Sequence, residues 1–286
     1  MSKIVISGYY GFANAGDEAM LTAIVKSLRK AEESVDLTVI SGNPQNTSTK
    51  HLVNSIHRFA PCKIYSALAN CDLLLSGGGS LLQDVTSKKS LLYYLAVILL
   101  GKMMNKKVML YAHGIGPIRS NVLRKITKMV CNKVDLITVR DTDSLDELRR
   151  LGVTDTKIKL TADAVLTLAQ ADKVQGFKLL QNFNLSKDKP IVAISVRNWG
   201  SDDKYLQEMA KAADMLSKEK AVQIALFPLQ YPADVVACKK LQQFMKAEAV
   251  ILDTAFDTEQ FLAIMGCFDL LIGMRLHALV FAVVMG

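Results

Sequence analysis

Short runs of apolar and β-branched residues alternate along the chain with longer stretches in which apolar residues recur at helical spacing. In the first part of the chain this pattern predicts strands at residues 3–7, 37–41, 72–76, 107–111, 136–140 and 157–160 and helices at 16–31, 90–104, 120–132 and 142–151. After a looser region with one helix at 176–183, it predicts strands at 191–196, 222–227, 250–252 and 270–273 and helices at 203–218, 233–245 and 258–265. Such alternation is typical of parallel sheets covered by helices on both faces.

The loose, polar region around residues 163–190 predicts a boundary between two α/β domains, at residues 1–170 and 171–286. The length of 286 residues also favours two domains. Two Rossmann-like domains that face each other place a cleft at the carboxyl ends of both sets of strands. An apolar helix predicted at 277–286 has no following strand, so we expect the second domain to be incomplete.

Composition narrows the class of protein further. Half of the residues are hydrophobic and 22% are charged, which excludes a disordered chain. The five cysteines are widely spaced and form no C-x-x-C pair, so we expect a cytoplasmic protein with no disulfide framework and no zinc site. The amino-terminal residues enter a strand directly and predict no signal peptide. The longest apolar run, residues 91–100, has about half of the ~20 residues that a spanning helix requires.

The formal net charge is +8, and the surplus lies in the first half of the chain. Ten basic residues and no acidic residue lie between Lys88 and Lys133. Two interpretations of these basic residues stay open. Either they lie on solvated helix faces, or they attract the protein to an anionic membrane surface or a diphosphate-bearing substrate, where each basic group contributes ~1 kcal/mol. The apolar run at 91–100 favours the second interpretation, with a peripheral location at the inner leaflet of the cell membrane. No nucleic-acid-binding motif accompanies the charge, so nucleic acid is not an expected partner.

Residues 7–18, SGYYGFANAGDE, lead from the first predicted strand into a helix. Glycines at such a junction let a ligand approach the backbone, and the helix N-terminus favours anions. The spacing is not G-x-G-x-x-G, so a dinucleotide site is only weakly indicated. Asn14 and Gly16 are candidate substrate-binding residues. Asp17 and Glu18 either complement the helix dipole or act on a substrate, by accepting hydrogen bonds from sugar hydroxyls or as a base.

Three more strand ends of the first domain carry candidate substrate-binding residues. These are Gly77, Gly78, Gly79, Asp84, His113, Gly114 and Arg140. A tight turn explains one or two of the consecutive glycines, whereas close approach of a sugar or phosphate explains all three. The histidine is either a buried, hydrogen-bonded core residue or a contact to substrate. The arginine either binds an anion or pairs with the aspartate beside it at the surface.

In the second domain, basic side chains follow two predicted strands. Arg197 lies at a strand's carboxyl end beside Trp199, the only tryptophan. Arg275 and His277 follow the final strand and open the last helix, where both can point toward the cleft. Guanidinium groups bind carboxylate and phosphate in a bidentate manner, and a histidine beside them can deliver a proton near neutral pH. The alternative is that these are capping and surface residues.

Five motifs occur in order along the chain: GFANAGDE (11–18), GGGSLLQD (77–84), HGIGP (113–117), VRD (139–141) and GMRLHA (273–278). With them the sequence resembles the polysaccharide pyruvyl transferase family, and most of all its bacterial cell-wall branch (CsaB). The resemblance implies a GT-B-like fold and transfer of pyruvate from phosphoenolpyruvate to a sugar as a cyclic 4,6-ketal. It also implies an acceptor: N-acetylmannosamine in a lipid-linked precursor of a secondary cell-wall polymer, whose pyruvate later anchors surface-layer proteins.

On this resemblance, Arg197 and Arg275 hold the donor phosphoenolpyruvate, His277 acts as the acid, and Asp17 or Glu18 orients or deprotonates an acceptor hydroxyl. Phosphoenolpyruvate is a substrate, and no cofactor or metal is expected. The alternative enzyme is a GT-B glycosyltransferase that uses a nucleotide sugar. A non-catalytic binder of sugar polymers or lipid diphosphates is the alternative from another class. The basic cluster of the second domain argues against such a binder, because plain sugar binding does not require so much positive charge.

Overall fold

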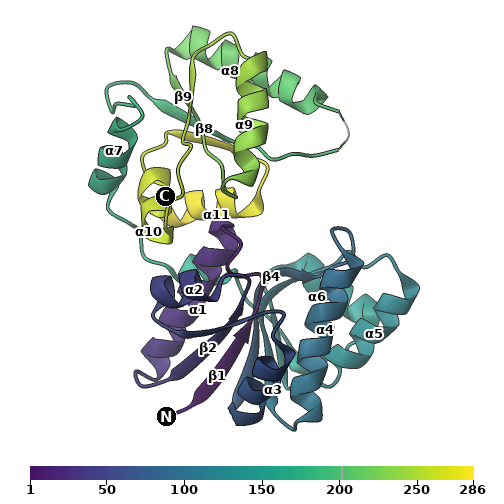
Figure 1. The fold of residues 1–286 in the computed structure, drawn as a ribbon. Helices are drawn as coiled ribbons and strands as arrows, with labels where there is room; N and C mark the ends of the chain where they lie inside the picture. Colours follow the sequence, from purple (N-terminus) through teal and green to yellow (C-terminus); the bar gives the residue numbers. More distant parts are fainter. Residues whose placement is uncertain (201) are drawn as a thin grey trace. The chain divides into compact units, whose positions relative to one another are not determined.

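The structure is a computed structural model that describes residues 1–200 and 202–286, and the chain forms two compact α/β units (Figure 1). The first unit comprises Met1–Phe12 and Asp17–Thr167, and the second comprises Ala13–Gly16 and Leu168–Gly286. The first unit ends close to the boundary predicted at residue 170. The segment Ala13–Gly16, predicted as part of the first domain, belongs to the second unit because its backbone pairs with the chain around Leu229.

In the described part of the first unit, a sheet of seven parallel strands has the order β3-β2-β1-β4-β5-β6-β7. The strands are β1 (Lys3–Ser7), β2 (Asp36–Ser41), β3 (Asn54–His57), β4 (Leu73–Leu82), β5 (Lys107–Ile115), β6 (Leu136–Val139) and β7 (Ile158–Leu160). The helices are α1 (Ala15–Ala31), α2 (Pro44–His51), α3 (Pro61–Asn70), α4 (Lys88–Met103), α5 (Asn121–Cys131) and α6 (Thr142–Leu151). The strand order reverses between β1 and β4, and ligands of such sheets bind beyond the carboxyl ends of the strands at that point.

The second unit has a four-stranded parallel sheet in the order β10-β9-β8-β11. Its strands are β8 (Ile191–Ser195), β9 (Gln223–Leu226), β10 (Ala249–Ile251) and β11 (Leu270–Gly273). Its helices are α7 (Lys173–Gln181), α8 (Lys204–Lys220), α9 (Ala233–Phe244), α10 (Thr258–Met265) and α11 (Leu276–Met285). Here the order reverses between β8 and β11, so the segments after these two strands flank the position where a ligand is expected.

Two strands of the first unit extend further than the sequence pattern predicts. The strand predicted at 72–76 continues as β4 to Leu82, and the strand predicted at 107–111 continues as β5 to Ile115. The extensions pair with each other, with a register shift between Gly79 and Leu82. The glycine run and His113 therefore lie within strands, not in the turns after them.

Three elements between β2 and β4 are absent from the pattern-based prediction: α2, β3 and α3. The sequence of α2, PQNTSTKH, has almost no apolar residues, and β3 is a short edge strand. Local capping defines α2 instead, since the Asn43 side chain accepts a hydrogen bond from the Asn46 N–H and Pro44 occupies the first turn.

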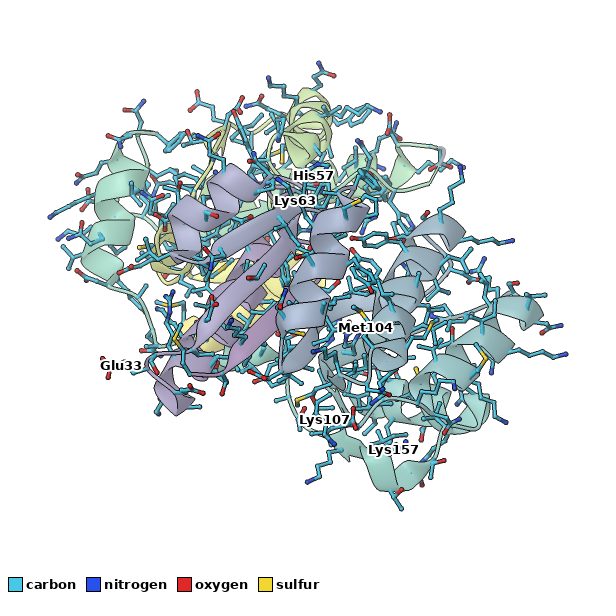
Figure 2. All side chains as sticks on the ribbon, turned by 60° about the horizontal axis from the view of Figure 1, so that its bottom comes forward. Glu33, His57, Lys63, Met104, Lys107 and Lys157 are labelled. Atoms are coloured by element: carbon cyan, nitrogen blue, oxygen red, sulfur yellow. The ribbon has the colours of Figure 1, made fainter. Side chains whose placement is uncertain are left out.

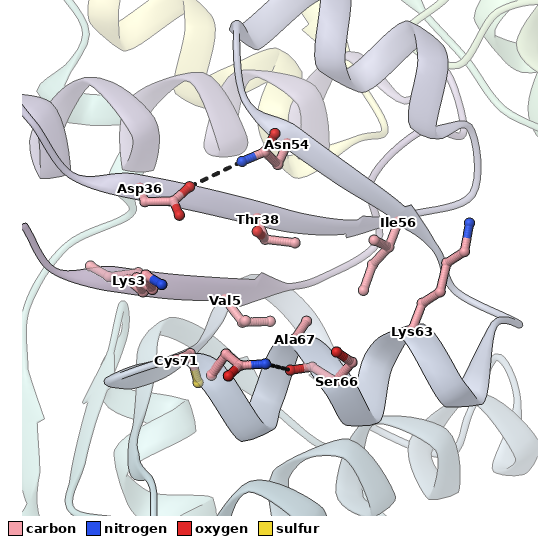
Figure 3. A pocket seen from close by; sticks show the side chains of 12 residues that line it. Lys3, Val5, Asp36, Thr38, Asn54, Ile56, Lys63, Ser66, Ala67 and Cys71 are labelled. Atoms are coloured by element: carbon pink, nitrogen blue, oxygen red, sulfur yellow. Dashed lines mark hydrogen bonds between the residues drawn. The ribbon is translucent and has the colours of Figure 1, made fainter.

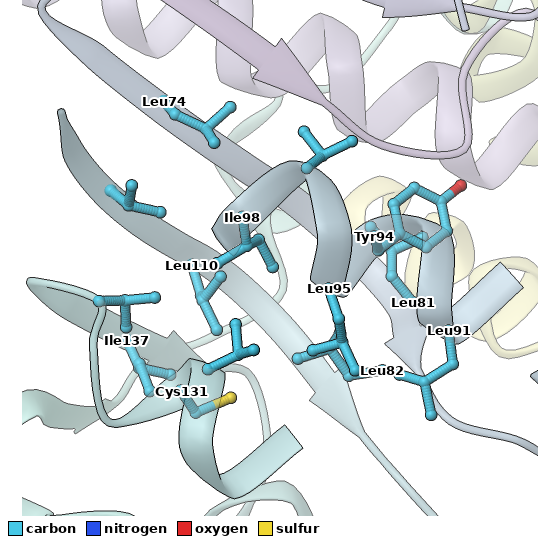
Figure 4. Close-up of a cluster of buried hydrophobic side chains, with 14 of the residues drawn as sticks. Leu74, Leu81, Leu82, Leu91, Tyr94, Leu95, Ile98, Leu110, Cys131 and Ile137 are labelled. Carbon is cyan, nitrogen blue, oxygen red and sulfur yellow. The ribbon is translucent and has the colours of Figure 1, made fainter. Parts of the chain in front are cut away.

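The apolar run at 91–100 forms part of α4, and most of its side chains pack in the core of the first unit, whereas Leu92 is 44% exposed. Leu91, Tyr94, Leu95 and Ile98 are at most 2% exposed and pack among side chains of the central strands (Figure 4). The expectation that this run favours membrane contact was therefore wrong, because the sheet buries it. Among the described residues, no helix is long and apolar enough to cross a membrane.

Candidate active site

The centre of the site in the second unit is a buried ion pair at the carboxyl edge of its sheet. Arg275 follows β11, and Asp234 lies in the first turn of α9. Arg275 Nε and Nη2 donate hydrogen bonds to the two carboxylate oxygens of Asp234, both at 2.6 Å, and Nη2 also donates to Gln230 Oε1 at 3.1 Å. Asp234 is 2% exposed. The carboxylate therefore fixes the plane of the guanidinium group.

The sequence pattern pointed to Arg275 but not to Asp234. The two residues are 41 positions apart, and an aspartate in the first turn of a helix is common as a partner of the helix dipole. Their pairing depends on the order in which β9, β8 and β11 lie in the sheet. The signal available in sequence is limited to the prediction that α9 and Arg275 both follow strand ends.

Arg197 follows β8, so it lies at the same sheet edge as Arg275. Its backbone oxygen accepts a hydrogen bond from the Tyr205 hydroxyl at 2.8 Å, and its guanidinium lies 5.1 Å from the ring centroid of Trp199. Burial, and then the positive charge of Arg275, lowers the pKa of Arg197 below its ordinary value. Two cations that repel each other across the ends of neighbouring strands favour an anion with two charged groups.

His277 lies in the first turn of α11, against the segment Ala13–Gly16 of the same unit. Asn14 forms an antiparallel bridge with Gln230, and its side chain accepts a hydrogen bond from the Gly16 N–H at 3.1 Å. A Cβ at Gly16 would overlap the imidazole of His277. The structure thus brings Asn14, Gly16, Arg275 and His277, which come from opposite ends of the sequence, into one unit.

Asp17 and Glu18 are adjacent in the first turn of α1, but their surroundings differ. Glu18 is 7% exposed, accepts a hydrogen bond from the Gly11 N–H at 2.8 Å, and lies 3.3 Å from His51 Nε2. Asp17 is partly exposed and borders Gly79, where a Cβ would lie 3.2 Å from Asp17 Oδ1. Glu18 therefore holds the loop after β1 in place, and Asp17 is the carboxylate that borders the glycine run.

We expect Glu18→Gln and Asp17→Asn to have opposite profiles. Glu18→Gln removes charge-assisted hydrogen bonds to a buried group and should lower the free energy of unfolding by about 1–3 kcal/mol. Asp17→Asn should leave that free energy nearly unchanged and lower kcat. Urea unfolding and turnover of the two variants measure both effects, and an equal loss of stability in the two would contradict this division of roles.

Side chains of the protein itself fill the space beside the first two glycines of the run. The Tyr10 hydroxyl donates a hydrogen bond to the Gly77 oxygen at 3.1 Å, and a Cβ at Gly78 would overlap the side chain of Met20. Gly78 and Gly79 have positive φ angles of 34° and 81°, which favour glycine. Packing against Tyr10 and Met20 thus accounts for Gly77 and Gly78, whereas Gly79, which is also buried, lies beside Asp17.

His113 is completely buried in β5. Its Nε2 lies 3.0 Å from the backbone oxygen of Ser76, which can only accept, so Nε2 carries the proton. His113 Nδ1 is buried and has no hydrogen-bond partner in the part of the chain that the structure describes. Burial lowers the pKa of His113 from 6.5 to about 4, so the ring is neutral near pH 7. Its position matches the core interpretation, in which it ties β5 to β4.

The buried histidine makes stability depend on pH. Between pH 6.5 and 4 the unfolded chain binds a proton at His113 that the folded chain does not, so stability falls as pH falls through this window. The shift corresponds to about 3 kcal/mol. Urea unfolding at pH 7 and pH 4 should therefore show a smaller loss on acidification for His113→Gln than for the wild type. Identical losses in the two proteins would contradict the assignment.

Arg140 and Asp84 both have protein partners. Arg140 Nη1 donates to Asp163 at 2.7 Å and Nη2 to Ser80 at 3.1 Å, with the arginine and Asp163 side chains each 7% exposed. The expected surface pair with the neighbouring aspartate is the weaker contact, at 3.7 Å. The Asp84 carboxylate accepts hydrogen bonds from the backbone N–H groups of Arg119 and Ser120, at 2.8 and 2.9 Å. Arg140 and Asp84 thus position the ends of β4 and β5.

Among the hollows that described residues of the first unit line, two are large enough to hold a sugar-sized ligand. One, of about 410 Å³, lies at the carboxyl ends of β4 and β5 and is lined by Gly114, Asp141, Asp143 and Glu147 among others. The other, of about 360 Å³, lies between α3 and the face of β1–β3, with Lys63 at one end of it (Figure 3). The first of these borders predicted site residues, and its three carboxylates outnumber its one arginine, Arg150, which suits hydroxyl groups better than phosphate. Among the described residues, no group of three or more His, Cys, Asp or Glu side chains is placed to hold a metal ion.

The fold of the chain is also found in solved structures of other proteins. The structure is similar to HepE of Anabaena in complex with UDP and glucose, with a TM-score of 0.62 at 14% identity, over 95% of this chain and 73% of that one. It is similar to the UDP-GlcNAc 2-epimerase of Methanocaldococcus jannaschii, with a TM-score of 0.64 at 12% identity, over 100% and 82% of the chains. At these identities the likeness shows the fold alone, which is α/β and GT-B-like, as predicted.

The sequence comparisons are more specific. The family model described as polysaccharide pyruvyl transferase matches residues 14–286, so the chain belongs to this family. It is also 23% identical over 342 residues to the amylovoran biosynthesis protein AmsJ of Erwinia amylovora, covering 99% of this chain and 81% of AmsJ. The family predicted from the five motifs is confirmed.

Proposed function

We propose that the chain transfers pyruvate from phosphoenolpyruvate to two hydroxyls of a sugar, forming a cyclic ketal and releasing phosphate. The observation that carries this proposal is the pair of arginines in the second unit. The guanidinium of Arg275 is fixed by Asp234, and its positive charge repels that of Arg197. Phosphoenolpyruvate carries its carboxylate and its phosphate on the same carbon atom, which suits two guanidinium groups. His277 opens the helix that follows Arg275 and supplies the acid.

In the proposed reaction, His277 donates a proton to the methylene carbon of phosphoenolpyruvate, which leaves positive charge at C2. One acceptor hydroxyl forms a bond to C2 and loses its proton. The bond between C2 and the phosphate oxygen then breaks, and phosphate leaves with the electron pair. The second hydroxyl adds to C2 and loses its proton. Of the two protons released, one replaces the proton taken from His277 and the other goes to phosphate. Arg197 and Arg275 hold the phosphate as it departs.

Donor binding can be followed through Trp199, the only tryptophan, because it lies beside Arg197. We expect phosphoenolpyruvate to change its fluorescence and to raise the temperature of unfolding, because a ligand of the folded state stabilises it. Pyruvate, inorganic phosphate and uridine diphosphate serve as parallel ligands. A response to uridine diphosphate alone would favour a glycosyltransferase and would contradict the proposal.

For the acceptor, we propose a saccharide of a lipid-linked polymer precursor, with N-acetylmannosamine of a secondary cell-wall polymer as the first candidate. The likeness to a protein of amylovoran biosynthesis supports an acceptor from a polymer pathway. Asp17 is the proposed base, Gly79 and Gly114 border the sugar, and the hydroxyls of the sugar suit the acidic hollow beyond β4 and β5.

We also propose that the chain acts at the anionic inner leaflet of the cell membrane, as a peripheral protein. Of the basic residues in 88–133, Lys102 pairs with Asp135 at 2.7 Å and Arg124 with Glu147 at 2.6 Å. Lys107, labelled in Figure 2, is 76% exposed, and its Nζ lies 3.6 Å from the carboxylate of Asp135. Six others are exposed and lie on or next to α4 and α5: Lys88, Lys89, Arg119, Lys125, Lys128 and Lys133. These exposed cations support the attachment, in place of the buried apolar run.

Co-sedimentation with vesicles tests this attachment. At ~1 kcal/mol per basic group, we expect Lys88→Ala with Lys89→Ala to weaken binding to phosphatidylglycerol vesicles by roughly tenfold or more. The matched control replaces Lys218 and Lys220 of α8, which are exposed in the second unit. Equal binding of both double variants, or equal binding to uncharged phosphatidylcholine vesicles, would rule out a role for these lysines.

A further inference from the structure

Arg58 lies among aromatic rings in the first unit. Its guanidinium carbon lies 4.7 Å from the ring centroid of Tyr93, 5.0 Å from that of Phe59 and 5.3 Å from that of Phe12. The ring of Tyr9 stacks on Phe12 at 4.2 Å, and the Tyr93 hydroxyl donates a hydrogen bond to the Arg58 backbone oxygen at 3.1 Å. Each such ring stabilises the cation and restricts its motion, so the guanidinium group is held in place before any ligand binds.

This cation has no counter-charge in the described part of the chain. No carboxylate lies within ion-pair distance of Arg58, and its Nε is buried without a hydrogen-bond partner among the described residues. Three other arginines of this unit, Arg124, Arg140 and Arg149, each pair with a carboxylate. A fixed guanidinium without a carboxylate is complementary to an anion supplied from outside.

The place of Arg58 in the fold is that of a ligand-binding residue. It directly follows β3, and Phe12 lies in the segment that follows β1, so both are at the carboxyl edge of the sheet. Burial raises the pKa of the Tyr94 hydroxyl, while the charge of Arg58 opposes this rise and the charge of Asp17 adds to it. Asp17 lies in the first turn of α1, which follows β1, so it is at the same carboxyl edge of the sheet as Arg58.

We propose that Arg58 and the rings around it bind a phosphate group attached to the acceptor saccharide. Phe59, 72% exposed, offers its ring face to the sugar, and Arg58 offers N–H donors to the phosphate oxygens. Another candidate at this edge is the hollow lined by Asp141, Asp143, Glu147 and Arg150, where the carboxylates outnumber the arginine and disfavour a phosphate. The assignment rests on the proposed function, because it places one part of that reaction's acceptor.

Isothermal titration with N-acetylmannosamine and N-acetylmannosamine 1-phosphate tests the site without turnover. We expect the wild type to bind the phosphate ester roughly 10- to 100-fold more tightly than the free sugar, and this preference to shrink as salt is added. Arg58→Met keeps the apolar stem between the rings and should abolish the preference. Arg58→Lys should retain part of it. Arg149→Met, which removes a paired and exposed cation, should leave it unchanged.

Three results would overturn the assignment. The first is equal binding of the two probes by the wild type, and the second is a preference that survives in a folded Arg58→Met variant. The third is a preference lost in Arg275→Lys but kept in Arg58→Met, which would place the phosphate in the second unit. None of these results depends on phosphoenolpyruvate, so the proposed pyruvyl transfer is decided separately by phosphate release from that donor.

Discussion

Replacing His277 with glutamine should lower kcat by roughly 10²–10⁴-fold, the range that a positioned general acid contributes. The expected cause is loss of the proton donor to the methylene carbon, so donor binding measured through Trp199 fluorescence should change little. Leu276→Gln is the matched control, because Leu276 precedes His277 in the first turn of α11 and is 49% exposed. An unchanged kcat in His277→Gln would remove this residue from the mechanism.

A second variant, at Gly16 near the other end of the sequence, tests whether the position of the His277 ring matters. Gly16→Ala places a methyl group where the His277 imidazole lies, so the ring must move. We expect a lower kcat with His277 still present. Full activity of Gly16→Ala would show that the position of the ring does not matter.

The second large effect is expected at the buried ion pair of the second unit. Arg275→Ala leaves the Asp234 carboxylate, 2% exposed, without its partner, and should lower the free energy of unfolding by about 3–5 kcal/mol. It should also abolish binding of phosphoenolpyruvate. Arg149→Ala is the control for stability, since its partner Asp155 is exposed and such pairs contribute only about 0–1 kcal/mol.

A double variant separates the two consequences. Arg275→Met with Asp234→Leu replaces the buried pair with apolar side chains of similar size, so stability should largely return while donor binding stays lost. Urea unfolding and titration of phosphoenolpyruvate measure the two quantities on the same sample. Donor binding restored together with stability would show that Arg275 serves the fold alone.

The sequence predicted best those elements whose own pattern is strong. The observed bounds of α6, α10 and β11 are the predicted ones, because each has helix-capping residues or a compact apolar run that marks its ends. It predicted least well where long-range packing decides the structure. The helix α2 has almost no apolar residues, so an apolar pattern cannot predict it. The extension of β4 through the glycines depends on pairing with β5.

The same division applies to the candidate site. Arg197, Arg275 and His277 could be found because basic residues after predicted strands indicate an anion site. Asp234 and the approach of Gly16 to His277 could not, since both depend on which loops the folded second unit brings together. Glu18, Arg140 and Asp84 look equally functional in the sequence, but their hydrogen bonds to the protein itself are visible only in the fold.

The central claim, that phosphoenolpyruvate is the donor for ketal formation, is tested most directly by product analysis. The chain is incubated with phosphoenolpyruvate and an acceptor that bears terminal N-acetylmannosamine, and phosphate release and the mass of the acceptor are followed in the same samples. We expect one phosphate released for each acceptor that gains a pyruvate ketal, and neither product with His277→Gln. Phosphoenolpyruvate left intact by the wild type, with a sugar transferred from a uridine nucleotide in a parallel reaction, would contradict the account.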